Sequence, residues 1–118
     1  MIRQGDVYWF DFQRPTGSGP AFHRPCVVVQ ADVFNESRIN TVVVCALTSN
    51  LRRAAVPGNV LLDEGEANLP ERSVVVVSQL FTVDKEDLLD KIGSLSTDHL
   101  RQVFEGLYHL LKPEDYPL

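Results

Sequence analysis

The chain has 118 residues, which is enough for one domain with a sizeable core, and its net charge is −5. Hydrophobic residues at 44% and charged residues at 23% exclude disordered, collagen-like and disulfide-scaffold classes. No apolar run approaches the length of a bilayer span, and the amino terminus lacks the pattern of a signal peptide. We therefore expect a single domain over residues 1–118 that is cytoplasmic and makes no membrane contact.

The charge is unevenly distributed. Residues 1–60 carry six basic and four acidic residues, whereas residues 61–118 carry five basic and twelve acidic residues. All six basic residues of the first half are arginines, at positions 3, 14, 24, 38, 52 and 53. The overall acidity argues against a protein that coats nucleic acid, but this asymmetry permits a local anion-binding face.

The first half of the chain predicts three strands. The aromatic-rich segment Asp6–Phe12 has the composition of a strand with both faces partly covered. A glycine- and proline-rich loop follows, and Pro25–Gln30 is apolar on both faces, which indicates an interior strand. Ala31–Asn40 is polar enough to be a connection with room for one helical turn. Thr41–Leu47 is a second continuous apolar, β-branched run and predicts another buried strand.

The next segments are two loops and two strands. Leu51–Gly58 reads as a second basic loop, Val60–Asp63 as a short strand and Glu64–Pro70 as an acidic link. Ser73–Gln79 is the most strand-prone segment of the chain, and Leu80–Val83 is expected to continue it after a bulge or bend.

The last third of the chain predicts helices around one brief strand. Residues 84–87 indicate a short helix with an aspartate N-cap, and Lys91–Leu95 can return to strand. Asp98–Leu111 places its apolar residues on one stripe and predicts a helix capped by Ser96 or Thr97. Many short strands followed by a terminal helix predict a mainly β fold, a small barrel or half-barrel with appended helices. The two cysteines, at 26 and 45, are expected to be buried core residues.

Arg24 is the first candidate for a functional residue. Pro25 restricts the residue before it to extended conformations, so the direction of Arg24 is fixed beside a glycine-rich loop. A guanidinium offers a planar fork of donors to phosphate or carboxylate. Taken alone, this stretch favours an exposed arginine beside a turn over a ligand-binding one.

Polar residues also follow the second buried strand. Thr48, Ser49 and Asn50 end that strand, where hydroxyl and amide groups can meet a ligand at the rim of a sheet. The alternative is a turn in which these side chains satisfy their own backbone. The three histidines and two cysteines lack metal-ligand spacing, and no phosphate-cradling loop precedes a helix, so we expect no metal and no cofactor.

Five ordered blocks carry a family resemblance: GDVYW at 5–9, HRPCVVVQAD at 23–32, VVVCALTSN at 42–50, SVVVVSQLFTVDK at 73–85 and KIGSL at 91–95. With them, the chain from about Arg3 to Leu111 resembles the MazF/PemK toxins of bacterial toxin–antitoxin pairs, which are small endoribonucleases called mRNA interferases. The resemblance implies an SH3-like antiparallel β-barrel with a C-terminal helix, a homodimer, a cognate antitoxin and metal-independent cleavage of single-stranded RNA.

The family's catalytic arginine, in its Arg-Pro motif, falls on Arg24, and its catalytic threonine falls on Thr48. The resemblance implies attack of the RNA 2′-hydroxyl on the adjacent phosphorus, with Arg24 stabilising charge and Thr48 orienting the reacting groups. Residues expected to line the RNA path are Phe22, His23, Ser49, Asn50, Arg52, Arg53 and Gln79.

His23 adjoins Arg24 and could titrate as a general base, but neighbouring residues of a strand point to opposite faces, which argues against that role. The loop before the Arg-Pro motif reads GSGPAFHRP, without the acidic or glutamine residue of many relatives, so sequence preference does not transfer. We expect this loop, from Thr16 to Phe22, to form a flap over the RNA groove.

Two other functions stay open at the level of sequence. The related gyrase-poisoning toxins share this barrel, inhibit a protein and cut nothing, although they act through C-terminal residues unlike KPEDYPL here. An SH3-like binding module without catalysis is the other, and an inactive relative would be expected to lose the arginine or the threonine.

Overall fold

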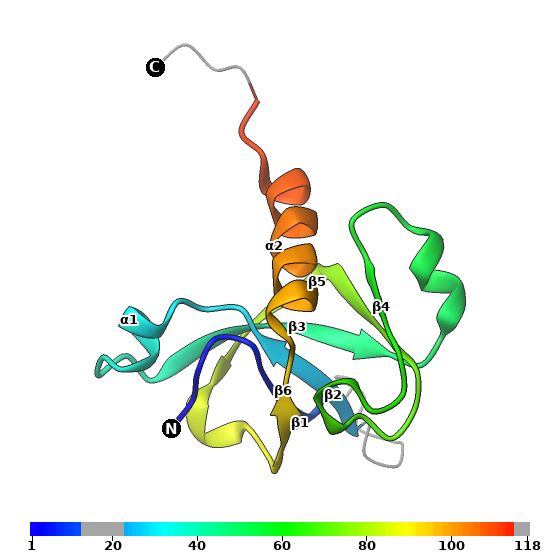
Figure 1. The fold of residues 1–118 in the computed structure, drawn as a ribbon. Helices are drawn as coiled ribbons and strands as arrows, with labels where there is room; N and C mark the ends of the chain where they lie inside the picture. Colours follow the sequence, from blue (N-terminus) through cyan, green and yellow to red (C-terminus); the bar gives the residue numbers. More distant parts are fainter. Residues whose placement is uncertain (13–22, 115–118) are drawn as a thin grey trace.

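The computed structural model describes residues 1–12 and 23–114 (Figure 1). Its six strands form one sheet in the order β4-β5-β3-β2-β1-β6, and all neighbouring strands are antiparallel. The strands are β1 (Asp6–Asp11), β2 (His23–Val28), β3 (Thr41–Thr48), β4 (Val60–Leu62), β5 (Ser73–Asp84) and β6 (Lys91–Ser94). The helices are α1 (Asp32–Asn35) and α2 (Thr97–Leu111), with 3₁₀ helices η1 (Leu51–Ala55), η2 (Glu66–Asn68) and η3 (Lys85–Asp87).

The sheet is curled because its two edges meet through η2, which follows edge strand β4. Asn68 Nδ2 donates to the backbone oxygen of Ile92 on the other edge strand, β6, at 3.2 Å. Gly93 lies so close to η2 that an added Cβ would collide with the backbone carbonyl of Ala67. The fold is thus a mainly β half-barrel with a C-terminal helix, as the sequence predicted (Figure 1).

Two apolar clusters cover the two faces of this sheet. Val27, Val75 and Leu47 belong to the larger cluster, which also includes Val103 and Leu107 from α2. The smaller cluster holds the alternate residues of the same strands: Cys26, Val28, Val42 and Val44. Cys26 and Cys45 are both buried free thiols, which confirms their predicted place in the core.

Strand β2 is an interior strand, but its boundaries differ from the prediction. It begins at His23, so Pro25 lies within the strand and pairs with Trp9 of β1 instead of opening the strand. It ends at Val28, because the next two backbone N–H groups, of residues 29 and 30, both donate to the carbonyl of Val43 at 3.0 and 3.3 Å. The earlier start brings His23 and Arg24 into the ladder with β1.

Strand β5 contains the predicted bulge. Cys45 pairs with Leu80, but Leu47 pairs with Val75, so β5 carries three more residues than β3 between these pairs. Asn59 Oδ1 accepts the backbone N–H of Val77 at 3.1 Å and so satisfies one donor that the bulge removes from the ladder. The second half of β5 continues to residue 84, beyond the predicted end.

Two capping predictions had different outcomes. Ser96 caps α2, since its side chain accepts the backbone N–H of His99 at 3.3 Å. The predicted cap by Asp84 is wrong: η3 does follow this residue, but the Asp84 side chain makes no capping hydrogen bond. Asp84 is still paired with Thr41 at the end of β5, so its backbone belongs to the sheet. The predicted basic loop after β3 contains η1.

Helix α2 packs closely on the sheet side at Gly106. An added Cβ there would collide with the carbonyl oxygen of Gly58, whose own φ is +89°. The predicted apolar stripe of α2 is only half covered, however. Val103 and Leu107 are buried, whereas Phe104 is 36% exposed and Leu111 is 61% exposed.

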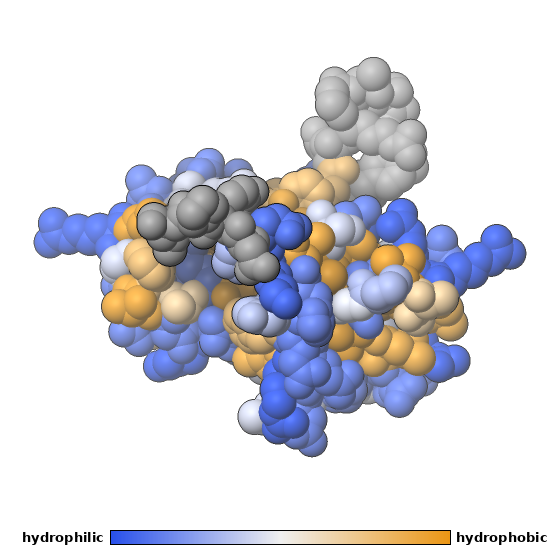
Figure 2. Space-filling view, turned by 90° about the horizontal axis from the view of Figure 1, so that it is seen from above, coloured by the Kyte–Doolittle hydropathy of each residue, from blue (hydrophilic) through white to orange (hydrophobic). Residues whose placement is uncertain are grey.

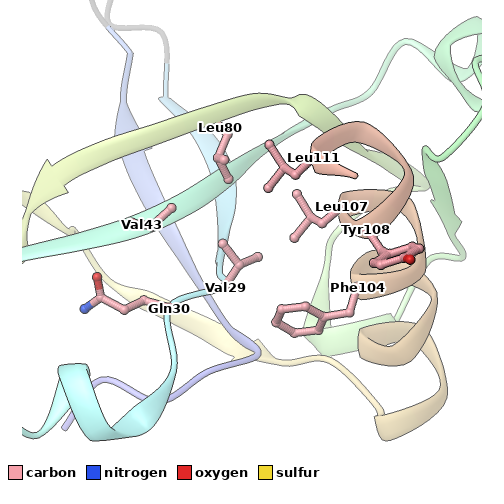
Figure 3. Close-up of a pocket in the computed structure, with 8 residues that line it drawn as sticks. All are labelled: Val29, Gln30, Val43, Leu80, Phe104, Leu107, Tyr108 and Leu111. Atoms are coloured by element: carbon pink, nitrogen blue, oxygen red, sulfur yellow. The ribbon is translucent and has the colours of Figure 1, made fainter. Parts of the chain in front are cut away.

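The uncovered half of the stripe forms one side of a groove of about 560 Å³, which we call the α2 groove (Figure 3). Its other side comes from strands β3 and β5 and the segment after β2. The lining is almost entirely apolar: Val29, Gln30, Val43, Leu80, Phe104, Leu107, Tyr108 and Leu111. Hydrophobic residues reach the surface between hydrophilic ones on the face viewed in Figure 2.

Within residues 1–12 and 23–114, no helix has the length and apolarity needed to cross a membrane.

Candidate active site

Arg24 is held in place by two hydrogen bonds and an aromatic ring. Its Nε donates to the backbone oxygen of Leu47 at 2.9 Å, and its Nη2 donates to Oε1 of Gln79 at 2.9 Å. The guanidinium carbon lies 5.5 Å from the centre of the Phe12 ring, within cation–π range. The bulge of β5 matters here, because Gln79 lies in it and reaches across to β2.

The charge of Arg24 is poorly compensated. Three of its five N–H groups make no hydrogen bond with the residues that the structure describes. Partial burial lowers the pKa of Arg24, and the positive charge of Arg53 lowers it further. An anion bound to the open N–H groups would relieve both unfavourable effects, so the geometry favours an anion site at this position.

Thr48 lies beside Arg24 at the end of β3. The antiparallel register pairs Cys26 of β2 with Ala46 of β3, and its continuation by two residues brings Arg24 opposite Thr48. The Thr48 Oγ1 accepts the backbone N–H of Asn50 at 3.2 Å, as expected for a hydroxyl in a turn. Its own O–H can still donate, so the turn and the functional role are compatible.

Arg24 and Thr48 line one pocket of about 210 Å³ at the strand ends, which we call the strand-end pocket. Its walls come from β1, β2, β3 and the segment entering β5. The lining residues are Trp9, His23, Arg24, Pro25, Leu47, Thr48, Ser49, Pro70, Glu71 and Ser73. The structure therefore brings together four residues of the sequence-predicted site, namely Arg24, Thr48, His23 and Ser49. A fifth, Gln79, does not line the pocket but accepts a hydrogen bond from Arg24.

His23 does take part in this pocket, although strand alternation suggested that it would face away from Arg24. Alternation itself holds, since His23 pairs with Asp11 and Arg24 pairs with Phe10. The pocket lies at the end of β2, where it wraps around the strand and is lined by residues of both faces. His23 therefore lies at the predicted site, while the expectation that it does not act as the general base stays a prediction.

The other predicted residues lie around the pocket. Asn50 caps η1, because its side chain accepts the backbone N–H of Arg52 at 3.2 Å. Arg52 and Arg53 are exposed on η1, and Arg53 is close enough to act electrostatically on Arg24. Phe22 and the predicted flap lie outside the described residues.

Residues 3–111 match the family described as PemK-like, MazF-like toxin of type II toxin-antitoxin system. The chain belongs to this toxin family. It is 40% identical over 111 residues to the endoribonuclease MazF6 of Mycobacterium tuberculosis (strain H37Rv), a match that spans 94% of this chain and 97% of the relative. The endoribonuclease MazF2 of Mycobacterium bovis matches to the same extent.

Solved structures show the same fold. One, an endoribonuclease in complex with its cognate antitoxin from a mycobacterial species, superposes with a TM-score of 0.77 at 23% identity and covers 99% of this chain and 100% of that chain. Another, the MazE-MazF structure (Form-II) from Deinococcus radiodurans, gives a TM-score of 0.77 at 20% identity and covers 96% and 97%. The six-stranded half-barrel with its terminal helix is therefore the MazF-type fold.

Six lining residues of this pocket were not among the predicted site residues: Pro25, Leu47 and Ser73, which belong to the strands around it, and Trp9, Pro70 and Glu71. Trp9 was assigned only to its strand, Pro70 only to the link Glu64–Pro70, and Glu71 to no element. The sequence did contain one signal for Glu71. This residue follows a proline just before the most strand-prone segment, and the candidates Arg24 and Thr48 likewise lie near the terminus of a strand. Among the described residues, no three His, Cys, Asp or Glu side chains cluster as metal ligands would.

Proposed function

We propose that this chain is a sequence-specific endoribonuclease toxin that cleaves single-stranded RNA, including messenger RNA, by attack of a 2′-hydroxyl and without a metal ion. The observation that carries the proposal is the partly desolvated guanidinium of Arg24 beside Thr48. It is anchored by Leu47 and Gln79, and three of its N–H groups bond to none of the described residues. A phosphodiester is an anion that such a fork binds through two oxygens. Because messenger RNA is the substrate, the proposed site of action is the cytoplasm.

The reaction needs little covalent chemistry from the protein. The 2′-oxygen loses its proton and forms a bond to phosphorus, the bond from phosphorus to the 5′-oxygen breaks, and the leaving oxygen gains a proton. The products are a 2′,3′-cyclic phosphate and a 5′-hydroxyl. Arg24 donates to the non-bridging oxygens and stabilises the negative charge that increases on them in the transition state. An arginine stays protonated near neutral pH, so its role is charge stabilisation and not proton transfer.

The neighbours of Arg24 position the substrate. The Thr48 hydroxyl can donate to a phosphate oxygen or orient the 2′-hydroxyl, since only its acceptor side is used by the turn. Gln79 fixes the plane of the guanidinium. Ser49 and Asn50, with the two arginines of η1, extend the donor-rich surface along which the RNA backbone continues.

Two protein partners belong to this proposal. Relatives of the fold have been solved in complex with antitoxins. We assign the antitoxin of this chain to the arginine-bearing surface, where an acidic peptide would exclude RNA by occupying the same charges. We assign the α2 groove to a second copy of the chain, because an apolar surface of this size on the outside of a small domain is typical of a permanent protein interface.

Cleavage of a defined single-stranded RNA panel by purified protein in EDTA tests the function. The expected result is cleavage that leaves a 2′,3′-cyclic phosphate and that stops when a single 2′-deoxy substitution is placed at the cut site. The gyrase-poison type of activity is not favoured, since the relatives reported above are endoribonucleases. No cleavage of any RNA, or cleavage that EDTA abolishes, would contradict the proposal.

A further inference from the structure

The strand-end pocket contains more than an anion site. At about 210 Å³ it is larger than a phosphate group needs, and its lining includes three further residues, Trp9, Pro70 and Glu71, which we call the wall of the pocket. Trp9 supplies a half-buried aromatic ring, and Pro70 a rigid apolar one. The charged member of this wall is an acid, whose charge has the wrong sign for binding phosphate.

The Glu71 carboxylate is unengaged within the described part of the chain: no hydrogen bond or ion pair there involves it. The neighbouring base, Arg72, forms its ion pair with Asp63 and not with Glu71, with 3.6 Å between Arg72 Nε and Asp63 Oδ1. The backbone of Glu71 is fixed, however, because its carbonyl oxygen accepts the Ser73 hydroxyl at 3.0 Å. A fixed backbone with an unpaired carboxylate in a pocket next to an anion site suits a ligand group that donates hydrogen bonds.

We propose that this wall binds a nucleobase next to the scissile phosphate, and that the Glu71 carboxylate accepts a hydrogen bond from the exocyclic amino group of that base. The inference rests on the proposed function, in which Arg24 holds the phosphate. Arg24 and Glu71 line the same pocket, so one nucleotide can reach both with its phosphate and its base. In single strands the base edge is free for such contacts, and an aromatic ring such as Trp9 packs against the base face.

The chemistry of the carboxylate defines which bases fit. A carboxylate accepts hydrogen bonds and offers no donor, so it matches the amino groups of adenine, cytosine and guanine. Uracil presents carbonyl oxygens on both sides of its single N–H, and these oxygens would face the negative charge of Glu71. The pocket therefore selects an amino-bearing base and disfavours uracil at one of the two positions that flank the cut.

The test uses the full chain and short RNAs in which each flanking position is changed in turn to each of the four bases. Wild type is expected to cleave amino-bearing RNAs about tenfold faster than the uracil RNA at one position. Glu71→Gln, whose amide can either accept or donate, should reduce this difference to about twofold. Glu64 is exposed, as Glu71 is, but lies outside the pocket, so Glu64→Gln removes the same charge and should keep the wild-type preference.

Binding of the same RNAs with a 2′-deoxy substitution at the cut site separates this inference from the proposed cleavage. A base preference in affinity that depends on Glu71 supports the subsite even if no RNA is cut. Equal treatment of uracil and amino-bearing bases by wild type at both positions, in cleavage and in binding, would overturn the inference. So would a Glu71→Gln variant that is folded by circular dichroism and keeps the full preference.

Discussion

The strand-end pocket and the α2 groove are both uncovered parts of the same half-barrel, but they are incomplete in different ways. In the pocket, Arg24 is partly removed from water, its pKa is lowered further by the charge of Arg53, and some of its N–H groups bond to no residue in the described part of the chain. In the groove, side chains such as Phe104 and Leu111 are exposed within a lining that is almost entirely apolar. The pocket therefore suits an anion, and the groove suits an apolar partner.

This difference separates chemistry from assembly. A desolvated guanidinium gains most from a ligand whose charge increases during a reaction, as a phosphate does in its transition state. An apolar groove gains from burial alone, which is roughly proportional to area and insensitive to charge. Changes in the pocket should therefore affect catalysis at constant oligomeric state, and changes in the groove should affect oligomeric state first.

The largest effect is expected for Arg24→Ala. Loss of the charge that stabilises the transition state should lower the cleavage rate about 10³-fold. Arg24→Lys keeps a positive charge but loses the planar fork, and should recover only a small part of the rate. Rates on a single-stranded RNA measure this, with the exposed Arg38→Ala as the matched control. Cleavage by Arg24→Ala at the wild-type rate would remove this residue from the mechanism.

The next effect is on assembly. Phe104→Asp places a charge in the α2 groove and should convert the dimer into a folded monomer, because burial of the carboxylate at the interface is unfavourable. Phe34→Asp makes the same change on α1 at a side chain that is 55% exposed and lies outside the groove, and it should stay dimeric. Light scattering after size exclusion measures the mass. A monomeric wild type, or a dimeric Phe104→Asp variant, would assign the groove to another partner.

A smaller effect on the cleavage rate is expected for Gln79, which accepts a hydrogen bond from Arg24. Gln79→Leu removes one anchor of the guanidinium at the Nη2 atom and should lower kcat about tenfold, with little change in KM for the RNA. Gln79→Glu should also be slow, since a carboxylate at this position would neutralise the charge that the phosphate needs. Gln102→Leu, an exposed change on α2, serves as the control. If kcat is unchanged in Gln79→Leu, Arg24 does not need this anchor.

The last prediction concerns the buried core, through the dependence of the free energy of unfolding on pH. Burial raises the pKa of the Cys26 and Cys45 thiols from the ordinary value of 9.0 to about 12. Between these values the folded chain keeps protons that the unfolded chain loses, so the free energy of unfolding should fall as the pH rises from about 9 to 12.

Chemical denaturation across this pH range measures the effect. The control is the double variant Cys26→Ala with Cys45→Ala, which should lose stability less steeply. Some dependence should remain in it, because burial, followed by the charge of Asp6, also raises the pKa of Tyr8. Both thiols of the native protein should resist a thiol reagent at pH 8. Rapid modification without unfolding would show that the core opens.

The sequence predicted the elements whose signal is local. Continuous apolar runs placed β3 and β5, helical spacing placed α2, and the resemblance pointed to Arg24 and Thr48. Side-chain contacts that depend on the three-dimensional fold could not be predicted from the sequence. The contact of Gln79 with Arg24 needs the β5 bulge, and Glu71 joins the pocket only because β5 starts beside the end of β3. Periodicity placed Phe104 and Leu111 on the apolar face of α2 but could not show that the sheet leaves them uncovered.

The position of the bound phosphate tests the account most directly. A crystal structure with an RNA made uncleavable by a 2′-deoxy substitution at the cut site would locate the scissile phosphate. The account predicts its oxygens within hydrogen-bonding distance of the open Arg24 N–H groups and near the Thr48 hydroxyl, with Leu47 and Gln79 still bonded to the guanidinium. A scissile phosphate held elsewhere, with Arg24 pointing into solvent, would contradict it.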